Sequence, residues 1–291
     1  MPAKPTTPSS SASSKSPSPG VQRPSLVKKL TALAQTQQFY WFLGHLFGIL
    51  FSVLSLVTGV FYKNTSLKYF RFALLSIIST YFIIIRQVYF KNGLKEIIVP
   101  RLARDENVQY VVLALVLLTS TFVTGDQVAA GLYSYDIFAV FHVLNYFRNH
   151  LLEVLIPSLQ AQQKISSQIN AFTQRFNQPA LYVASAIEVS LVVTSGFELI
   201  ILPFAVLLRW RSISYAVAKL VVFLSVVVFN KLRYDGSQYT RAIVSELDKN
   251  QVNFVTRLNN PKVTQLYNNV KGQIVHILKS IQLPKDVKKT Q

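Results

Sequence analysis

The sequence predicts an all-α protein whose helices cross a membrane several times. Hydrophobic residues make up 51% of the chain and charged residues only 14%, and the mean hydropathy is +0.33. Residues 39–62 contain no Asp, Glu, Lys or Arg, and about 20 apolar residues suffice for a helix to cross the hydrocarbon core. Because core helices of soluble proteins rarely stay uncharged on every face, we interpret this run as a membrane span.

Six apolar runs follow one another, joined by alternately short and long connections, which predicts three helical hairpins. The runs cover residues 39–62, 69–90, 108–123, 128–147, 180–208 and 212–230. The fourth run is the weakest, because Asp136 lies near its centre and an unpaired charge at mid-depth costs at least a few kcal/mol. A four-span arrangement is therefore the second interpretation.

The distribution of basic residues predicts that both termini lie on the cytosolic side. The three short connections, residues 63–68, 124–127 and 209–211, hold only Lys63, Lys68, Arg209 and Arg211 of the chain's 30 lysines and arginines. Most of the others lie in the tails and the long connections, as the positive-inside rule expects of cytosolic segments.

Three regions differ in composition. Residues 1–24 are rich in serine and proline without apolar periodicity, which predicts a disordered cytosolic tail. Residues 25–230 hold the transmembrane domain, entered through a short helix that Ser25 can cap. Residues 231–291 form a basic tail facing the cytosol or nucleoplasm.

Two ion pairs are expected between the last two spans. If these spans form a hairpin bent near Trp210, Glu198 and Lys219 differ in depth by only about 4 Å, and Glu188 and Arg233 meet at the opposite end. We interpret both as structural pairs between neighbouring helices, although intramembrane charges also occur along transport paths.

The basic tail contains two candidate amphipathic helices, in residues 237–259 and 261–283. In the second, one face is apolar and carries the candidate membrane-binding residues Val263, Leu266, Tyr267, Val270, Ile274, Ile277, Leu278 and Ile281, flanked by Lys262, Lys271 and Lys279. This pattern is typical of a helix lying in a membrane interface and held by anionic headgroups. The other interpretation is that the two helices pack on each other or on a partner.

The net charge of +18 is interpreted as positive-inside bias and attraction to anionic lipid, and no nucleic-acid partner is expected. The absence of cysteine excludes disulfides and Cys-ligated metals. His45, His142, His150 and His276 have no metal-site spacing, and the sequence has no phosphate loop or nucleophile elbow. We therefore expect no enzyme activity, cofactor or metal. His142 and Asp136 could be drawn as an acid/base pair, but their spacing favours a polar packing role.

The chain ends with Lys288 and Lys289 third and fourth from the C-terminus. Lysines at these positions look like the dilysine signal that returns membrane proteins to the endoplasmic reticulum.

Several short motifs resemble the transmembrane protein 33 family, and within it the small fungal pore-membrane nucleoporins. They are residues 33–45 (LAQTQQFYWFLGH), His142 with Tyr146, Glu188, Leu232-Arg233-Tyr234, Tyr239-Thr240-Arg241 and Glu246-Leu247. The resemblance covers roughly residues 26–260. It implies residence in the endoplasmic reticulum and nuclear envelope, association with nucleoporins and reticulon-like tubule-shaping proteins, and a role in pore assembly or distribution. It carries no catalytic residues.

Two function classes follow. The first is a membrane-shaping or scaffolding protein in which tight hairpins and the basic helix occupy curved bilayer. The second is a small-solute or ion transporter or channel that uses Glu188, Glu198 and Lys219. A nuclear transport receptor is a further partner that fits the basic tail.

Overall fold

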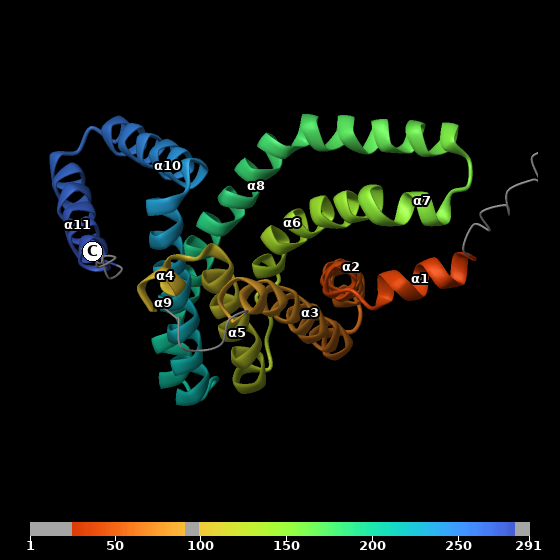
Figure 1. Ribbon diagram of the computed structural model, residues 1–291. Coiled ribbons are helices and arrows are strands. Elements are labelled where there is room, and N and C mark those ends of the chain that lie inside the picture. The colour runs from red at the N-terminus through yellow and green to blue at the C-terminus, as the bar shows by residue number, and fades with distance from the viewer. Residues whose placement is uncertain (1–24, 91–98, 283–291) are drawn as a thin grey trace, which may run out of the picture.

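The computed structural model describes residues 25–90 and 99–282, and within them every regular element is a helix (Figure 1). The chain begins with α1 (Leu26–Ala34), which Ser25 caps by accepting a hydrogen bond from Lys28 N at 3.4 Å. Thr36 in the same way caps α2 (Gln37–Gly59), accepting from Phe39 N at 3.2 Å. The first apolar run is therefore one helix, as the sequence predicts.

The hairpin of α2 and α3 (Lys63–Tyr89) closes more tightly than expected. Residues 63–68, predicted to be the turn, are the first turns of α3, and only residues 60–62 connect the helices. Reciprocal hydrogen bonds stabilise this end, because Ser55 Oγ donates to Ser66 O at 3.0 Å and Ser66 Oγ donates to Ser55 O at 2.7 Å.

The second hairpin contains α5 (Glu106–Thr124) and α6 (Ala130–Tyr146), preceded by the short α4 (Val99–Arg104). Gly125 ends α5 with φ 65°, a left-handed conformation that glycine adopts without steric cost. The helical path of α6 continues through a π-helical turn, η2 (Phe147–Leu151), into α7 (Leu152–Leu155).

The third hairpin differs from the prediction at its start. Residues 159–179, expected to be a polar connection, form the first part of α8 (Leu159–Leu207), a single helix of 49 residues. Figure 1 shows this part running beside α6 and α7 before α8 turns into the bundle. Pro179 and Pro203 lie inside α8, and proline bends a helix by removing a backbone hydrogen bond. α9 (Ile213–Gly236) continues past residue 230, the expected end of the domain.

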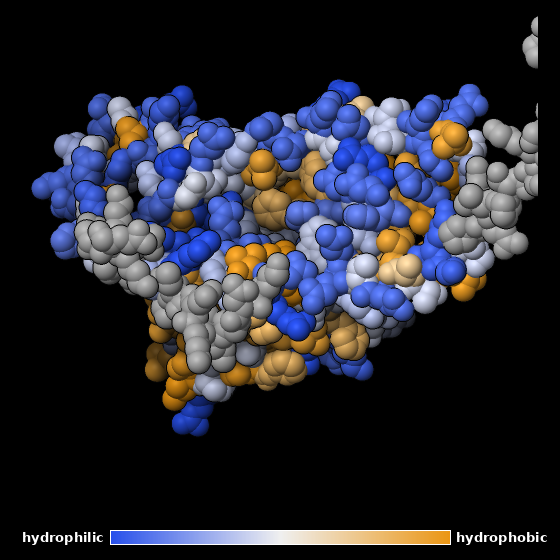
Figure 2. Space-filling view, in the orientation of Figure 1, coloured by the Kyte–Doolittle hydropathy of each residue, from blue (hydrophilic) through white to orange (hydrophobic). Residues whose placement is uncertain are grey.

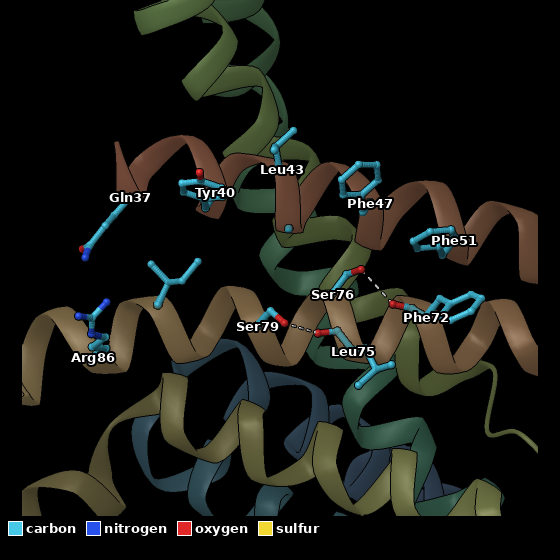
Figure 3. Close-up of a pocket in the computed structure, with 12 residues that line it drawn as sticks. Gln37, Tyr40, Leu43, Phe47, Phe51, Phe72, Leu75, Ser76, Ser79 and Arg86 are labelled. Carbon is cyan, nitrogen blue, oxygen red and sulfur yellow. Dashed lines mark hydrogen bonds between the residues drawn. The ribbon is translucent and has the colours of Figure 1, made fainter. Parts of the chain in front are cut away.

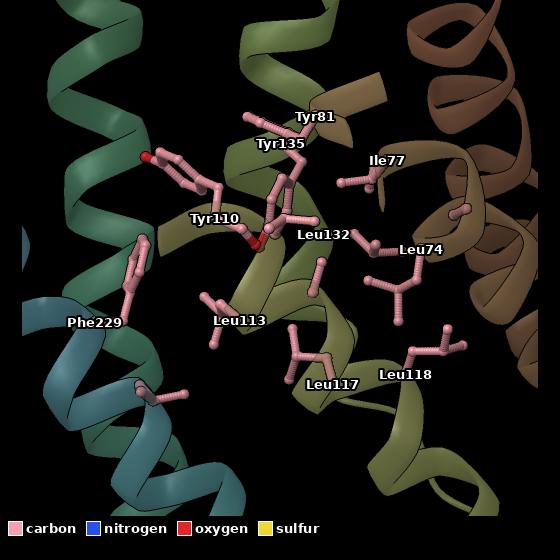
Figure 4. Close-up of a cluster of buried hydrophobic side chains, with 14 of the residues drawn as sticks. Leu74, Ile77, Tyr81, Tyr110, Leu113, Leu117, Leu118, Leu132, Tyr135 and Phe229 are labelled. Atoms are coloured by element: carbon pink, nitrogen blue, oxygen red, sulfur yellow. The ribbon is translucent and has the colours of Figure 1, made fainter. Parts of the chain in front are cut away.

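The main hydrophobic core lies where α5 meets α3 and α9. Figure 4 shows the ring of Tyr110 (α5) between those of Phe229 (α9) and Tyr135 (α6), at centroid distances of 5.1 and 5.4 Å. Leu74 and Leu117 are completely or almost completely buried beside them. α5 is thus the central helix, and the outer helices turn apolar side chains outward.

Five of the described helices are long and apolar enough to cross a membrane: α2, α3, α5, α8 and α9. α6, with 17 residues, stands at the lower limit of about 17–25 residues for a span. In Figure 2, hydrophobic residues gather on the lower part of the visible face, over α5 and α9, and hydrophilic residues cover the upper part. This division is expected of a bundle whose lower part lies in lipid.

Candidate membrane-binding surface and buried charge networks

The helix α10 (Gln238–Arg257) is attached to the bundle at its N-terminal end. Ser237 caps the helix, and Thr240 and Ile243 are buried. Tyr182 Oη in α8 donates to Glu246 Oε2 at 2.6 Å. The first turns of α10 are therefore packed on α8, whereas Phe254 near its end is exposed.

The helix α11 (Pro261–Ser280) has no buried side chain. Three residues of the expected apolar face are more than half exposed: Leu266 (64%), Ile274 (52%) and Ile277 (61%). Val270 is also exposed, and the remaining members are partly covered: Val263, Tyr267, Leu278 and Ile281. Large apolar side chains in water are unfavourable, so this face is available to bind lipid or a partner.

One edge of α11 contacts α10. Lys271 Nζ lies 2.5 Å from Asp248 Oδ1, and Tyr267 Oη donates to the same oxygen at 3.0 Å. The pKa of Asp248 is lowered from its ordinary value, first by the hydrogen bond from Lys271 and then by that from Tyr267. The sequence analysis assigned Tyr267 and Lys271 to the membrane-binding surface and kept packing between the two helices as the other interpretation. In the structure, these two side chains contact α10. Leu266 and Ile277 remain exposed beside this contact.

The other two lysines of the expected membrane-binding surface, Lys262 and Lys279, do not contact α10 through an ion pair. Lys262 and Lys279 are exposed and make no ion pair within the described part of the chain. Lys288 and Lys289, the expected retrieval signal, lie outside the described residues, as does the tail of residues 1–24.

The structure brings Glu188 and Arg233 together in the bundle. Arg233 Nε lies 3.4 Å from Glu188 Oε2, and Arg233 Nη1 lies 2.9 Å from Glu106 Oε1. Tyr110 Oη donates to Glu188 Oε1 at 2.5 Å, and Asn230 Nδ2 donates to the Glu188 carbonyl at 2.9 Å. The side chain of Glu188 is 1% exposed, so its charge depends on these donors.

Glu198 and Lys219 also meet, with Lys219 Nζ 2.8 Å from Glu198 Oε2. The lysine side chain is 8% exposed and the glutamate side chain 53% exposed. The pair therefore joins α8 and α9 at the bundle surface, and the buried lysine depends more on it than the glutamate does.

Asp126 forms a third network that sequence reasoning missed. Its carboxylate accepts from Lys63 Nζ at 2.7 Å and from Tyr215 Oη at 3.0 Å, and Arg211 lies 3.6 Å away. Although partial burial alone raises the pKa of Asp126, the hydrogen bonds from Lys63 and Tyr215 and the positive charges of Lys63 and Arg211 lower it below its ordinary value. All three hairpin ends meet there.

A sequence signal for this network existed. The short connections were expected on one side of the membrane, and Asp126 is the acidic residue among their four basic ones. A carboxylate placed among those cations is expected to form ion pairs with them.

The motif at residues 33–45 packs against α6 and η2. The ring of His142 lies 4.7 Å from that of His45 and 4.9 Å from that of Trp41, and Phe42 stacks on Tyr146 at 4.7 Å. His142 is thus engaged with aromatic neighbours, in agreement with a packing role. The motif joins α2 to the end of α6.

A family model described as "Transmembrane protein 33/Nucleoporin POM33" matches residues 22–280. The chain belongs to this family. The match includes all of the transmembrane helices, α10 and α11, so the family's characteristic sequence extends beyond the bundle into the basic tail.

Three curated relatives illustrate the family. The chain is 31% identical over 248 residues to "Pore and endoplasmic reticulum protein of 33 kDa" of Saccharomyces cerevisiae, covering 82% of this chain and 89% of that protein. It is 27% identical to "Nucleoporin POM33" of Chaetomium thermophilum, covering 88% and 90% respectively. It is also 27% identical to "Tetra-spanning protein 1" of Schizosaccharomyces pombe, covering 75% and 76%. No solved structure matches the chain.

Within the described residues, no group of three or more His, Cys, Asp and Glu side chains is arranged to hold a metal ion. Asp126, Glu188 and Glu198 instead bind basic residues of neighbouring helices. Family membership and the five long apolar helices of the described residues both describe a multi-pass membrane protein.

Proposed function

We propose that the chain is a non-enzymatic protein of the endoplasmic reticulum and nuclear envelope that contributes to nuclear pore complex assembly or distribution and to membrane shaping. The observation that carries the proposal is the exposed apolar face of α11, whose lysines 262 and 279 are free to meet anionic headgroups. The names of the relatives, which refer to the pore and the endoplasmic reticulum, support the location.

The chemistry of α11 suits the surface of a bilayer. Leu266, Ile274 and Ile277 can enter the boundary between headgroups and acyl chains, while the lysines remain among the phosphates. Such an insertion expands one leaflet, which favours curved membrane. Nucleoporins, reticulon-like proteins and a nuclear transport receptor are the protein partners we propose for the same tail.

A polarity-sensitive fluorophore tests the membrane contact directly. Because the chain has no cysteine, Val270→Cys provides one labelling site in the full-length protein reconstituted in liposomes. We expect a blue shift with anionic lipid that disappears in Ile274→Asp/Ile277→Asp. The control Gln265→Asp/Asn269→Asp adds the same charge on the opposite face and should keep the shift. An unshifted wild-type probe contradicts membrane binding.

The cellular role requires a second readout. We expect the tagged wild-type protein to form puncta at the nuclear rim, and Ile274→Asp/Ile277→Asp to spread evenly through the reticulum with unchanged abundance. An even reticulum for both proteins contradicts the pore role and leaves general membrane shaping as the function.

We further propose six spans with both termini cytosolic. α6, with 17 residues, reaches the lower limit for a span, and the turn before it meets the ends of the other two hairpins at Asp126. In this topology the turns at residues 60–62, 125–129 and 208–212 are lumenal.

Single cysteines decide the topology. We expect an impermeant maleimide to reach Gln251→Cys in intact cytosol-facing vesicles, but Phe61→Cys and Trp210→Cys only after permeabilisation. If α6 alone does not cross, Trp210→Cys will react on the side opposite to Phe61→Cys. If the whole α5–α6 hairpin does not cross, Gln127→Cys in its turn will react in intact vesicles. Either result contradicts the six-span proposal.

The transporter hypothesis receives less support from the contacts. Glu188, Glu198 and Lys219 are each bound to a partner on a neighbouring helix. If they served transport, Glu198→Gln would abolish function while leaving folding and location intact; we expect instead a modest loss of stability.

A further inference from the structure

A groove runs along the outer surface of the α2–α3 hairpin (Figure 3) and has a volume of about 710 Å³. At one end, Gln37 and Arg86 extend toward each other from the two helices; at the other lie Phe47, Phe51 and Phe72. The groove thus has one polar and one aromatic end.

Two serines of α3 line the middle of the groove, and their small side chains present an essentially apolar surface. Ser76 Oγ donates to Phe72 O at 2.9 Å, and Ser79 Oγ donates to Leu75 O at 2.8 Å. Because these hydroxyls are already satisfied by their own helix, they present small surfaces that need no further polar partner. Gly44 of α2 lies opposite them, where a Cβ atom would come within 3.4 Å of Ser76 O. The floor can therefore accept a hydrocarbon chain.

The dimensions match one leaflet of a bilayer. Gln37 and Phe51 are separated along α2 by about 21 Å at 1.5 Å per residue, and one leaflet contributes about 15 Å of hydrocarbon. A lipid whose headgroup lies beside Gln37 can therefore place an acyl chain along the whole apolar part of the groove.

The polar end offers a cation without an internal partner. Arg86 is exposed and makes no ion pair with any residue in the ranges 25–90 and 99–282. Arg71 on the same helix is different, because it donates to Thr121 Oγ1 and O at 2.9 and 2.8 Å and stacks over Phe122. A guanidinium at the edge of the hydrocarbon core is stabilised by a bidentate phosphate.

We propose that this groove binds one anionic phospholipid, with its phosphate on Arg86 and one acyl chain between Phe47, Phe51 and Phe72. Tyr40 supplies a hydroxyl beside the headgroup, and Gln37 supplies its amide N–H groups, because its Oε1 already accepts from Gln87 Nε2 at 3.0 Å. The site lies on the hairpin and is separate from the α11 surface, so either can fail without the other.

A photoactivatable phospholipid with a diazirine in its acyl chain tests the site in the full-length protein in nanodiscs. Peptide mapping distinguishes the groove from the basic tail, which also attracts anionic lipid. With a phosphatidylserine probe, we expect labelling of residues 43–51 and 72–83 at least fivefold above that with phosphatidylcholine.

Two variants should remove this preference. Arg86→Gln removes the cation that balances the net negative charge of phosphatidylserine, a charge that zwitterionic phosphatidylcholine lacks. We therefore expect its labelling to fall to the phosphatidylcholine level, whereas Arg86→Lys should retain most of it. Ser79→Phe should fill the groove and prevent labelling with either lipid.

Two matched controls should leave the labelling unchanged. Lys68→Gln removes a charge from the other end of α3, and Ser190→Phe adds a ring at an exposed serine of α8 whose hydroxyl also donates to its own helix. Equal labelling by the two lipids, or unchanged labelling in Arg86→Gln and Ser79→Phe, overturns the proposal.

Discussion

The bundle and α11 differ in the burial of their side chains: the bundle buries an ion pair between its helices, whereas no side chain of α11 is buried. In the bundle, the carboxylate of Glu188 is 1% exposed and receives hydrogen bonds from Arg233 and Tyr110, while in α11 Leu266 and Ile277 are exposed. The ion pairs of the bundle therefore stabilise contacts between its own helices. The apolar face of α11, by contrast, is available to bind a membrane or a partner. Matched substitutions in the two regions test this difference.

The largest difference should come from removing one cation in each region. Arg233→Gln leaves Glu188 buried without its charged partner, which typically costs about 3–5 kcal/mol. Lys271→Gln removes a cation from a pair with Asp248 in which both side chains are 41% exposed, so solvent screens the pair and the expected loss of stability is much smaller. Thermal unfolding in detergent, followed by circular dichroism, measures both.

The double variant Glu188→Gln/Arg233→Met serves as the control for the buried pair. It removes both charges, so it should recover much of the stability that Arg233→Gln loses. Equal melting of Arg233→Gln and the wild type contradicts a structural role for the pair.

A smaller difference is expected between two glycines. A Cβ atom at Gly44 would lie 2.1 Å from Thr80 Oγ1, whereas one at Gly272 in α11 would meet nothing within 4 Å. Gly44→Ala should cost about 1–3 kcal/mol through overpacking of the α2–α3 hairpin, and Gly272→Ala should stabilise α11 by about 0.5–1 kcal/mol.

Melting of the bundle and the helicity of the tail measure these two effects separately. Thr80→Ala should rescue Gly44→Ala, because it removes the oxygen that the new methyl group meets. A hairpin that tolerates Gly44→Ala alone contradicts the close approach of α2 and α3.

The smallest effect should be the pH dependence of the Asp126 network. Its folded-state pKa lies below the unfolded value of about 4. The stability it contributes is therefore fully present above about pH 4 and is lost as the pH falls through the folded-state pKa.

Asp126→Asn removes that dependence. Because Lys63 is 75% exposed, we expect a loss below about 1 kcal/mol at neutral pH, and no difference from wild type once the pH is well below the folded-state pKa. A constant difference across the whole range contradicts the assignment to the carboxylate charge.

The sequence by itself determined the helical class and the main apolar helices, because burial in lipid requires long uncharged runs that are visible without any tertiary contact. The cap at Ser25 could also be predicted from the sequence, because a helix cap acts within one turn. The depth of Glu198 relative to Lys219 followed from counting residues along a hairpin, and the two side chains indeed lie in contact.

Only the tertiary structure decided which faces meet. Apolar periodicity did not place Glu106 and Tyr110 beside Glu188, bring three hairpin ends to Asp126, or engage Tyr267 and Lys271 with Asp248. Composition also could not show that α8 begins at Leu159, because a polar helix outside lipid resembles a polar loop when read one residue at a time. Hydropathy records the average surroundings of each segment, whereas a network depends on the angle and depth at which separate helices cross.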